Sequence, residues 1–295
     1  MRYINILLRS SIFILTFIIL SSKSFATLKN SSQGADVAAC SSTGDFMPSG
    51  GDCRTTPTKY EIGIFEMGLC TAHPFTNNGT KTDLVTMDKS TCITTFLATD
   101  QTNGSVVDIA GGIGGSIDLV GANTRPANGT YTYPYVILGK KFTLKTAKLA
   151  SNGNTYYGVA NSGSCTNSTM TTSAGSEVEC DDLLTNFGGG ECISGYVGAT
   201  IPIGTLDAFL TNTGLERSHH TEYTNPVCDK NGKLVGIINL TTPFIITANT
   251  LKMQFNFIVT DYGINLQDSG SDKLPNTIGS APFSGSFTIT EAPQQ

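Results

Sequence analysis

The chain has 295 residues and a formal net charge of −5, and charged residues make up 14% of it, below the roughly 25% of typical globular proteins. An acidic chain of this kind argues against nucleic acid as a partner. Small polar residues and glycine replace the charged ones. This composition is typical of exported β-proteins, because threonine favours strands and Asn-Gly favours turns.

The first 26 residues have the pattern of a cleavable export signal. Arg2 and Arg9 flank its start, the apolar run 12–20 follows, and Ser24-Phe25-Ala26 fits the small-x-small rule for cleavage. The apolar run is shorter than the about 20 residues that span a bilayer. Cleavage there removes three positive charges, which lowers the formal charge from −5 to −8. We therefore predict a secreted or cell-surface protein that passes through the periplasm and keeps no transmembrane anchor.

The segment 27–57 is polar and rich in glycine and serine, and we interpret it as an N-terminal arm before a domain that spans 58–295. In that domain the stretch 60–69 alternates apolar and polar residues and then shifts phase. This pattern predicts a strand with a bulge near Ile64. A second strand is expected at 92–98.

The rest of the chain alternates short apolar stretches with turn signals such as Asn-Gly. The segment 161–198 departs from this pattern, and we expect a cysteine-containing insertion there, with one helical turn around 181–184. Many short strands with turns between them predict an all-β, disulfide-stapled antiparallel β-sandwich. Further strands are expected at 106–109, 117–120, 130–149, 155–159, 233–240, 243–248, 251–261 and 286–290.

The stretch from Pro126 to Tyr131 precedes a strand of alternating tyrosine and aliphatic residues. It resembles the turn that opens a strand in prealbumin-like and related β-sandwich modules of exported bacterial proteins. The resemblance covers about a dozen residues, and Pro134 departs from an uninterrupted strand. It implies a β-sandwich and no particular function, since such folds serve many roles.

Eight cysteines follow the export signal, and none of them lies in a C-x-x-C pair, which argues against a zinc site. An exported chain meets an oxidising compartment, so we expect all eight to form disulfides. Eight cysteines allow about 105 connectivities, and the sequence leaves them open. Proximity along the chain favours Cys40–Cys53, Cys70–Cys92, Cys165–Cys180 and Cys192–Cys228.

We find no pattern of residues that indicates catalysis or a cofactor. The three histidines are His73 and the adjacent pair His219 and His220, whose side chains would point to opposite faces of a strand. Nucleophile, zinc-protease and phosphate-loop motifs are absent from the sequence. Asp268 and Asp272 form a weak calcium candidate, since their loop lacks a closing glutamate, and a solvated acidic loop is the alternative.

Tyr131, Tyr133 and Tyr135 recur at every second position, which on a strand would place three rings on one face. Two interpretations stay open: core packing, or an exposed platform that stacks on a glycan or a neighbouring subunit. Pro134 between them favours an edge strand, because proline cannot donate to a central ladder.

These observations lead to a secreted, non-enzymatic structural protein of the cell surface, such as a filament or pilus-like subunit that assembles through β-strand pairing. Its expected partners are further copies of itself or other surface proteins. Phe287 and Ile289, which alternate with polar residues near the end of the chain, are the candidate assembly residues. The alternative is a secreted adhesin or glycan-binding β-sandwich module, which the absence of tryptophan weakens.

Overall fold

The computed structural model describes residues 27–29, 38–41, 51–75, 85–150, 152–161, 164–185, 187, 196–201, 203–217, 231–268, 273–281 and 283–292. In these ranges the regular structure consists of β-strands, and nearly all of the strands pair antiparallel. The same ranges contain no helix that is long and apolar enough to cross a membrane. The predicted all-β, disulfide-stapled antiparallel fold is therefore confirmed.

Thirteen of the described strands form one large sheet, and the others form a three-stranded sheet and three two-stranded ribbons. The large sheet comprises β1 (Thr27–Lys29), β3 (Lys59–Cys70), β5 (Cys92–Ala98), β6 (Ser105–Asp108), β7 (Gly121–Asn123), β9 (Tyr133–Lys145), β10 (Ala147–Leu149), β11 (Thr155–Asn161), β12 (Ser164–Thr171), β13 (Cys180–Leu183), β14 (Tyr196–Ile201), β15 (Gly204–Thr211) and β17 (Lys233–Leu240). The small sheets are β2 (Asp52–Thr55) with β20 (Ile264–Gln267) and β21 (Thr277–Ser280), β19 (Thr250–Ile258) with β22 (Ser284–Glu291), β4 (Val85–Thr86) with β16 (Glu216–Arg217), and β8 (Gly129–Tyr131) with β18 (Phe244–Ile246).

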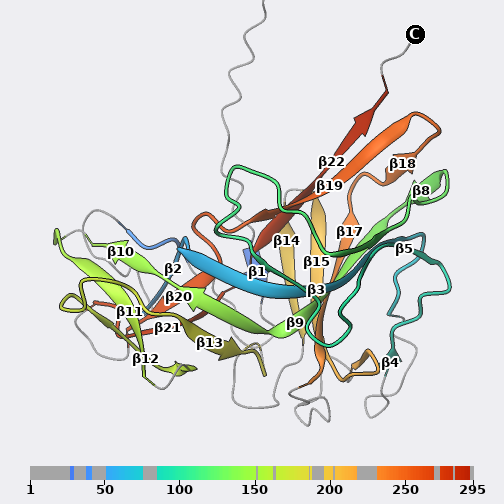
Figure 1. Ribbon diagram of the computed structural model, residues 1–295. Helices are drawn as coiled ribbons and strands as arrows, with labels where there is room; N and C mark the ends of the chain where they lie inside the picture. Colours follow the sequence, from blue (N-terminus) through green and yellow to red (C-terminus); the bar gives the residue numbers. More distant parts are fainter. Residues whose placement is uncertain are drawn as a thin grey trace, which may run out of the picture.

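Strand β9 is the axis of the large sheet. It pairs with β3 along its whole length, whereas its opposite edge pairs first with β17 over residues 135–139 and then with β13 over residues 141–144. The sheet therefore forks at β9, with β17, β15 and β14 on one branch and β13, β12 and β11 on the other (Figure 1). The register between β3 and β9 shifts on both sides of Ile64, which confirms the bulge expected there.

Both faces of the forked sheet are apolar, because side chains that alternate along β9 and β17 are buried on both sides. On one face Tyr135, Ile137 and Val235 pack under the connection between β3 and β5. On the other face Leu138 and Leu234 belong to the largest cluster of buried residues. Strands covered on both faces are expected to have nearly continuous apolar sequences, as the first half of β9 has over residues 133–138.

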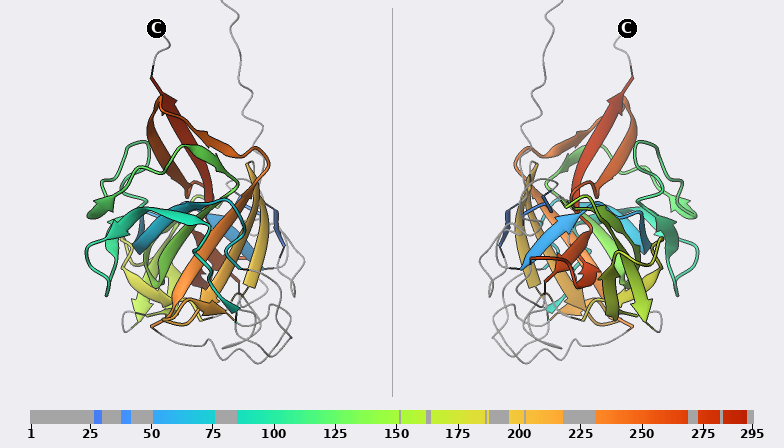
Figure 2. Two further views of the ribbon diagram at one scale, coloured as in Figure 1. Left: turned by 90° about the vertical axis from the view of Figure 1, so that its right-hand side faces the viewer. Right: turned by 90° about the vertical axis from the view of Figure 1, so that its left-hand side faces the viewer.

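Two of the small sheets cover this second face of the large sheet. The sheet β2–β20–β21 contributes buried residues such as Leu266 and Ile278 to the largest cluster. The ribbon β19–β22 packs Phe255 and Phe287 toward Ile238 of β17. Figure 2 shows the β19–β22 ribbon extending away from the rest of the fold.

Three expectations about segments need correction. The described parts of 27–57 are not a separate arm, because β1 pairs with β14 and β2 pairs with β20 inside the folded body. In the segment 161–198, which we expect to be a cysteine-containing insertion, the described strands β12 and β13 belong to the large sheet, and β13 is a strand where the sequence predicts a helical turn. Residues 117–120 do not form a strand; the strand begins afterwards, at β7.

Three of the expected disulfides are present. Cys40–Cys53, Cys70–Cys92 and Cys165–Cys180 join cysteines that are 13, 22 and 15 residues apart. These bonds fit an oxidising compartment, either extracellular or periplasmic. Cys192 and Cys228, whose pairing stays a prediction, lie outside the described residues, and so does the predicted export signal.

Candidate functional site

The three tyrosines do not form one platform. Tyr131 lies on β8 and is buried with Leu69 and Ile246, whereas Tyr133 and Tyr135 lie on β9 in a different cluster. The chain is irregular at Thr132, which breaks the alternation on which the prediction depended. Their role here is packing, and Pro134 lies on a strand that β3 and β17 flank rather than at an edge of the sheet.

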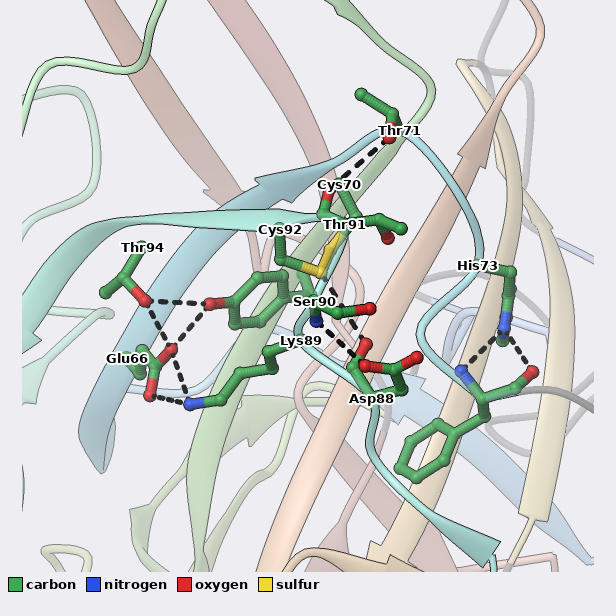
Figure 3. Close-up of a disulfide and its surroundings, with 12 residues drawn as sticks. Glu66, Cys70, Thr71, His73, Asp88, Lys89, Ser90, Thr91, Cys92 and Thr94 are labelled. Atoms are coloured by element: carbon green, nitrogen blue, oxygen red, sulfur yellow. Dashed lines mark hydrogen bonds and ion pairs between the residues drawn. A yellow bond between two sulfur atoms is a disulfide. The ribbon is translucent and has the colours of Figure 1, made fainter.

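Tyr135 donates a hydrogen bond to the buried carboxylate of Glu66, a contact that no sequence pattern indicates. The side chain of Glu66 on β3 is almost fully buried, and its carboxylate accepts hydrogen bonds from Tyr135 Oη at 2.5 Å and Thr94 Oγ1 at 2.8 Å. Lys89 Nζ lies 3.0 Å from both carboxylate oxygens. Burial, reinforced by the neighbouring Glu66 carboxylate, raises the pKa of Tyr135 above its usual range. Figure 3 shows Glu66, Lys89 and Thr94 beside the Cys70–Cys92 disulfide, which ties β3 to β5.

A second polar cluster lies on the same face of the large sheet, next to the β14–β15 pair. Asp207 accepts a hydrogen bond from Tyr196 Oη at 2.7 Å, and His73 Nε2 lies 3.5 Å from its other oxygen. Burial alone would raise the pKa of Asp207, but the contacts with His73 and Tyr196 outweigh it and hold that pKa below its usual value. The buried Arg217 stacks on Phe209, so the cluster is packed between aromatic rings.

The remaining sequence candidates have separate positions. The Asp268 carboxylate accepts the backbone N–H of Lys273 at 3.0 Å, while Asp272 lies outside the described residues. The described part of the chain contains no group of three or more His, Cys, Asp or Glu residues that could hold a metal ion. Phe287 and Ile289 lie opposite Phe255 and Met253 in the β19–β22 ribbon, so their side chains face the same side of it.

A cavity lies at the fork of the sheet, between the large sheet, the β19–β22 ribbon and the β20–β21 strands. It has a volume of about 580 Å³, which is within the range of small-molecule sites. Val136, Leu234 and Ile238 of the large sheet form one wall, and Phe255 and Phe287 of the ribbon face it. The wall is therefore mostly apolar, as in sites that bind hydrophobic ligands.

One end of this cavity is polar and carries negative charge. Asp52, Asp182 and Asn265 line it, and Asp182 Oδ2 accepts the backbone N–H of Ser280 at 2.6 Å. Burial raises the pKa of Asp52, and a hydrogen bond from Asn265 partly offsets this effect. The side-chain oxygen of Asn265 is buried and accepts no hydrogen bond within the described structure.

The sequence contains only a weak signal of this cavity. Gly236 and Gly285 both line the cavity, and a Cβ at Gly285 would lie 2.6 Å from Cζ of Phe255, so this glycine makes room for a ring of the cavity wall. A glycine within an apolar strand can indicate such a site. The acidic residues that line it belong to strands far apart in the sequence, so no motif connects them.

The outer edges of the β19–β22 ribbon have no strand partner among the described residues. Each strand pairs with the other, and the sheet topology of the described residues includes no second partner for either. Their outward-facing side chains are polar, and Asn256 Nδ2 donates to Thr288 Oγ1 at 3.0 Å.

Comparison of the chain with protein-family models, curated proteins and solved structures finds no match.

Proposed function

We propose that this protein is an exported, non-enzymatic structural subunit of the cell surface that assembles with further copies of itself through β-strand pairing. The observation that carries the proposal is the β19–β22 ribbon, whose two strands have no other partner in the described sheets. An open edge presents a row of unpaired N–H and C=O groups to a neighbouring chain. The three disulfides support an exported location, where covalent bracing persists.

Exposed apolar side chains at the start of the ribbon support the same conclusion. Ile245 of β18 is 62% exposed and Leu251 of β19 is 67% exposed, and the turn 247–250 connects their strands. Natural sheets usually protect open edges with charge, and these positions instead carry large aliphatic residues. We infer that this end of the ribbon contacts another subunit.

A second apolar surface, the 97–120 surface, offers a complementary contact. Its most exposed members are Val106 at 53% and Val120 at 70%, and the backbone N–H of Val120 donates to Ser105 Oγ, which places these two segments together. A filament requires two different surfaces that meet head to tail, since a single self-complementary patch closes into a dimer. The exposed large apolar residues of this surface are Leu97, Val106, Ile113, Ile117 and Val120.

The structure changes which residues should test assembly. Phe287 and Ile289 belong to clusters that pack the ribbon onto the body, so acidic substitutions there would disturb the fold itself. Thr288 and Thr290 are exposed on β22, and lysines at those positions add charge to the edge without entering the core. A matched control places the same two charges at the exposed Thr172 and Ser176, which lie outside any strand.

The test is the size of the purified mature protein over a concentration series, measured by light scattering and sedimentation, with negative-stain images. We expect wild type and T172K/S176K to form oligomers or fibres and T288K/T290K to remain monomeric with an unchanged circular dichroism spectrum. A wild type that is monomeric at every concentration would refute the proposal. The adhesin or glycan-binding alternative stays a prediction, but the burial of Tyr131 and Tyr135 removes the aromatic platform on which it depended.

A further inference from the structure

The cavity at the fork of the sheet combines an apolar wall with a polar end, where Asp52, Asp182 and Asn265 supply side-chain oxygens that accept hydrogen bonds. Asp52 and Asp182 contribute carboxylates, and the buried Asn265 oxygen has no partner among the described residues. No lysine, arginine or histidine is among the described residues that line the cavity. The charged side chains among these lining residues are therefore two carboxylates, and the buried Arg54 of β2, which is paired with Asn265, places its guanidinium over the Tyr262 ring.

The three acceptor residues are neighbours in space. Asn265 of β20 lies directly opposite Gly279 of β21, and a Cβ at position 279 would be 3.8 Å from Asp182 Oδ2. Directly opposite residues share one face of a sheet, so the Asp182 carboxylate lies next to the Asn265 side chain. The Asn265 side chain donates a hydrogen bond to Asp52 through its amide nitrogen. The amide oxygen of Asn265 has no hydrogen-bond partner within the described structure.

This arrangement selects the chemistry of a ligand. A primary ammonium group has three N–H donors and one positive charge, which suits a group of acceptors that includes two carboxylates. A fatty acid or phosphate head would instead place a third negative charge in a partly desolvated site. An aliphatic tail would lie along the apolar wall, where Leu234, Phe255 and Phe287 supply hydrocarbon surface.

We propose that this cavity binds an aliphatic amine, with its tail along the apolar wall and its ammonium group at Asp52, Asp182 and Asn265. Phe255 and Phe287 are only partly buried, so the ribbon side of the cavity is the expected route of entry. The proposal goes beyond assembly, because strand pairing would involve backbone groups at the outer edges of the ribbon, whereas the amine would contact side chains that line the cavity behind it. Two outward-facing residues of β22 can be changed without changing the lining.

The test compares three ligands with the same twelve-carbon tail, dodecylamine, dodecanol and dodecanoate, below their micelle concentrations, by isothermal titration calorimetry. We expect the amine to bind at least about tenfold more tightly than the carboxylate, as charge-assisted hydrogen bonds imply. Asp182→Asn keeps an acceptor for Ser280 but removes the charge, and it should remove most of this preference.

Asp181→Asn is the matched control. Asp181 is the neighbouring residue on β13, but its carboxylate lies 2.8 Å from Lys141 Nζ, accepts a hydrogen bond from Thr143 at 2.7 Å and is outside the lining of the cavity. The Asp181→Asn substitution removes one negative charge, as Asp182→Asn does, and should leave the preference for the amine unchanged. Ala208→Phe, which adds a ring to the cavity wall, should weaken binding of all three ligands; if that variant does not fold, the two aspartate variants still decide the question.

Equal affinity for amine and carboxylate, or an equal effect of D181N and D182N, would overturn the assignment of the polar end. Absence of binding by all three ligands would overturn the site as a whole. Repeating the titration with monomeric T288K/T290K separates this proposal from assembly, since a chain that never oligomerises can still bind the amine. Binding to that variant but not to assembled wild type would assign the cavity to a segment of a second copy and likewise overturn the proposal.

Discussion

Removal of the Glu66 carboxylate should cost a large part of the stability of this fold. In Glu66→Ala the hydroxyl groups of Tyr135 and Thr94 lose the carboxylate that accepts their hydrogen bonds. Each of these bonds ends on a charged acceptor in a nearly buried position. Such bonds contribute about 1.5–3 kcal/mol each. Lys89 adds little, because its side chain is 40% exposed and returns to water. We expect a loss of about 3–5 kcal/mol, which is roughly the sum of these two hydrogen bonds.

Glu66→Gln provides the graded comparison. Its amide oxygen can still accept from Tyr135, so the expected loss is about 1–2 kcal/mol. The measurement is urea unfolding of the oxidised protein followed by far-ultraviolet circular dichroism, since the chain has no tryptophan. A double-mutant cycle with Tyr135→Phe isolates the pair, and we expect a coupling of about 1 kcal/mol or more. A loss below about 1 kcal/mol for the alanine variant would refute the reasoning.

Three further predictions follow from single features of the structure. Burial raises the pKa of Tyr60 in the fold, so the stability that its neutral hydroxyl contributes is complete below pH 10.0, the ordinary pKa of tyrosine, and falls by about 1.4 kcal/mol per pH unit above it. In urea unfolding measured between pH 8 and 12, Tyr60→Phe should make the decline of stability shallower by this amount, while the part due to Tyr135 remains. The Tyr135 ring occupies the position of a Cβ at Gly68, so Gly68→Ala should destabilise by about 1–3 kcal/mol in urea unfolding, and a neutral result would contradict this packing. Thiol titration of the denatured, unreduced protein should find none free, and two reactive thiols per chain would show that Cys192 and Cys228 are not paired.

Local patterns predicted those parts of the fold that depend on residues close in the sequence. Alternation with period two is a property of one strand, so β3 and its bulge at Ile64 were predictable. Cysteines separated by 13 to 22 residues close short loops, and three of the expected pairs are present. The all-β class follows from the same signals, because threonine-rich strands and glycine turns do not require tertiary contacts to be recognised.

The sites depend on contacts that no local pattern contains. Alternation placed Tyr131 with Tyr135, but one irregular residue at Thr132 directs them into different clusters. Glu66 meets a tyrosine 69 residues away, and the fork at β9 brings strand β13 into the large sheet. The segment 161–198 lacks apolar alternation, so pairing with neighbouring strands decides where it becomes extended: β12 pairs with β11, and β13 pairs with β9.

The sequence by itself determined the class of this protein: a β-rich chain with cysteines positioned for short disulfide loops, behind a segment that predicts export. Tertiary structure alone decided where its chemistry lies. The acidic end of the cavity brings together β2, β13 and β20, strands separated by up to about two hundred residues, and the open ribbon is defined by which strands remain without a second neighbour. Both features depend on how sheets pack and end, and those are properties of the whole chain.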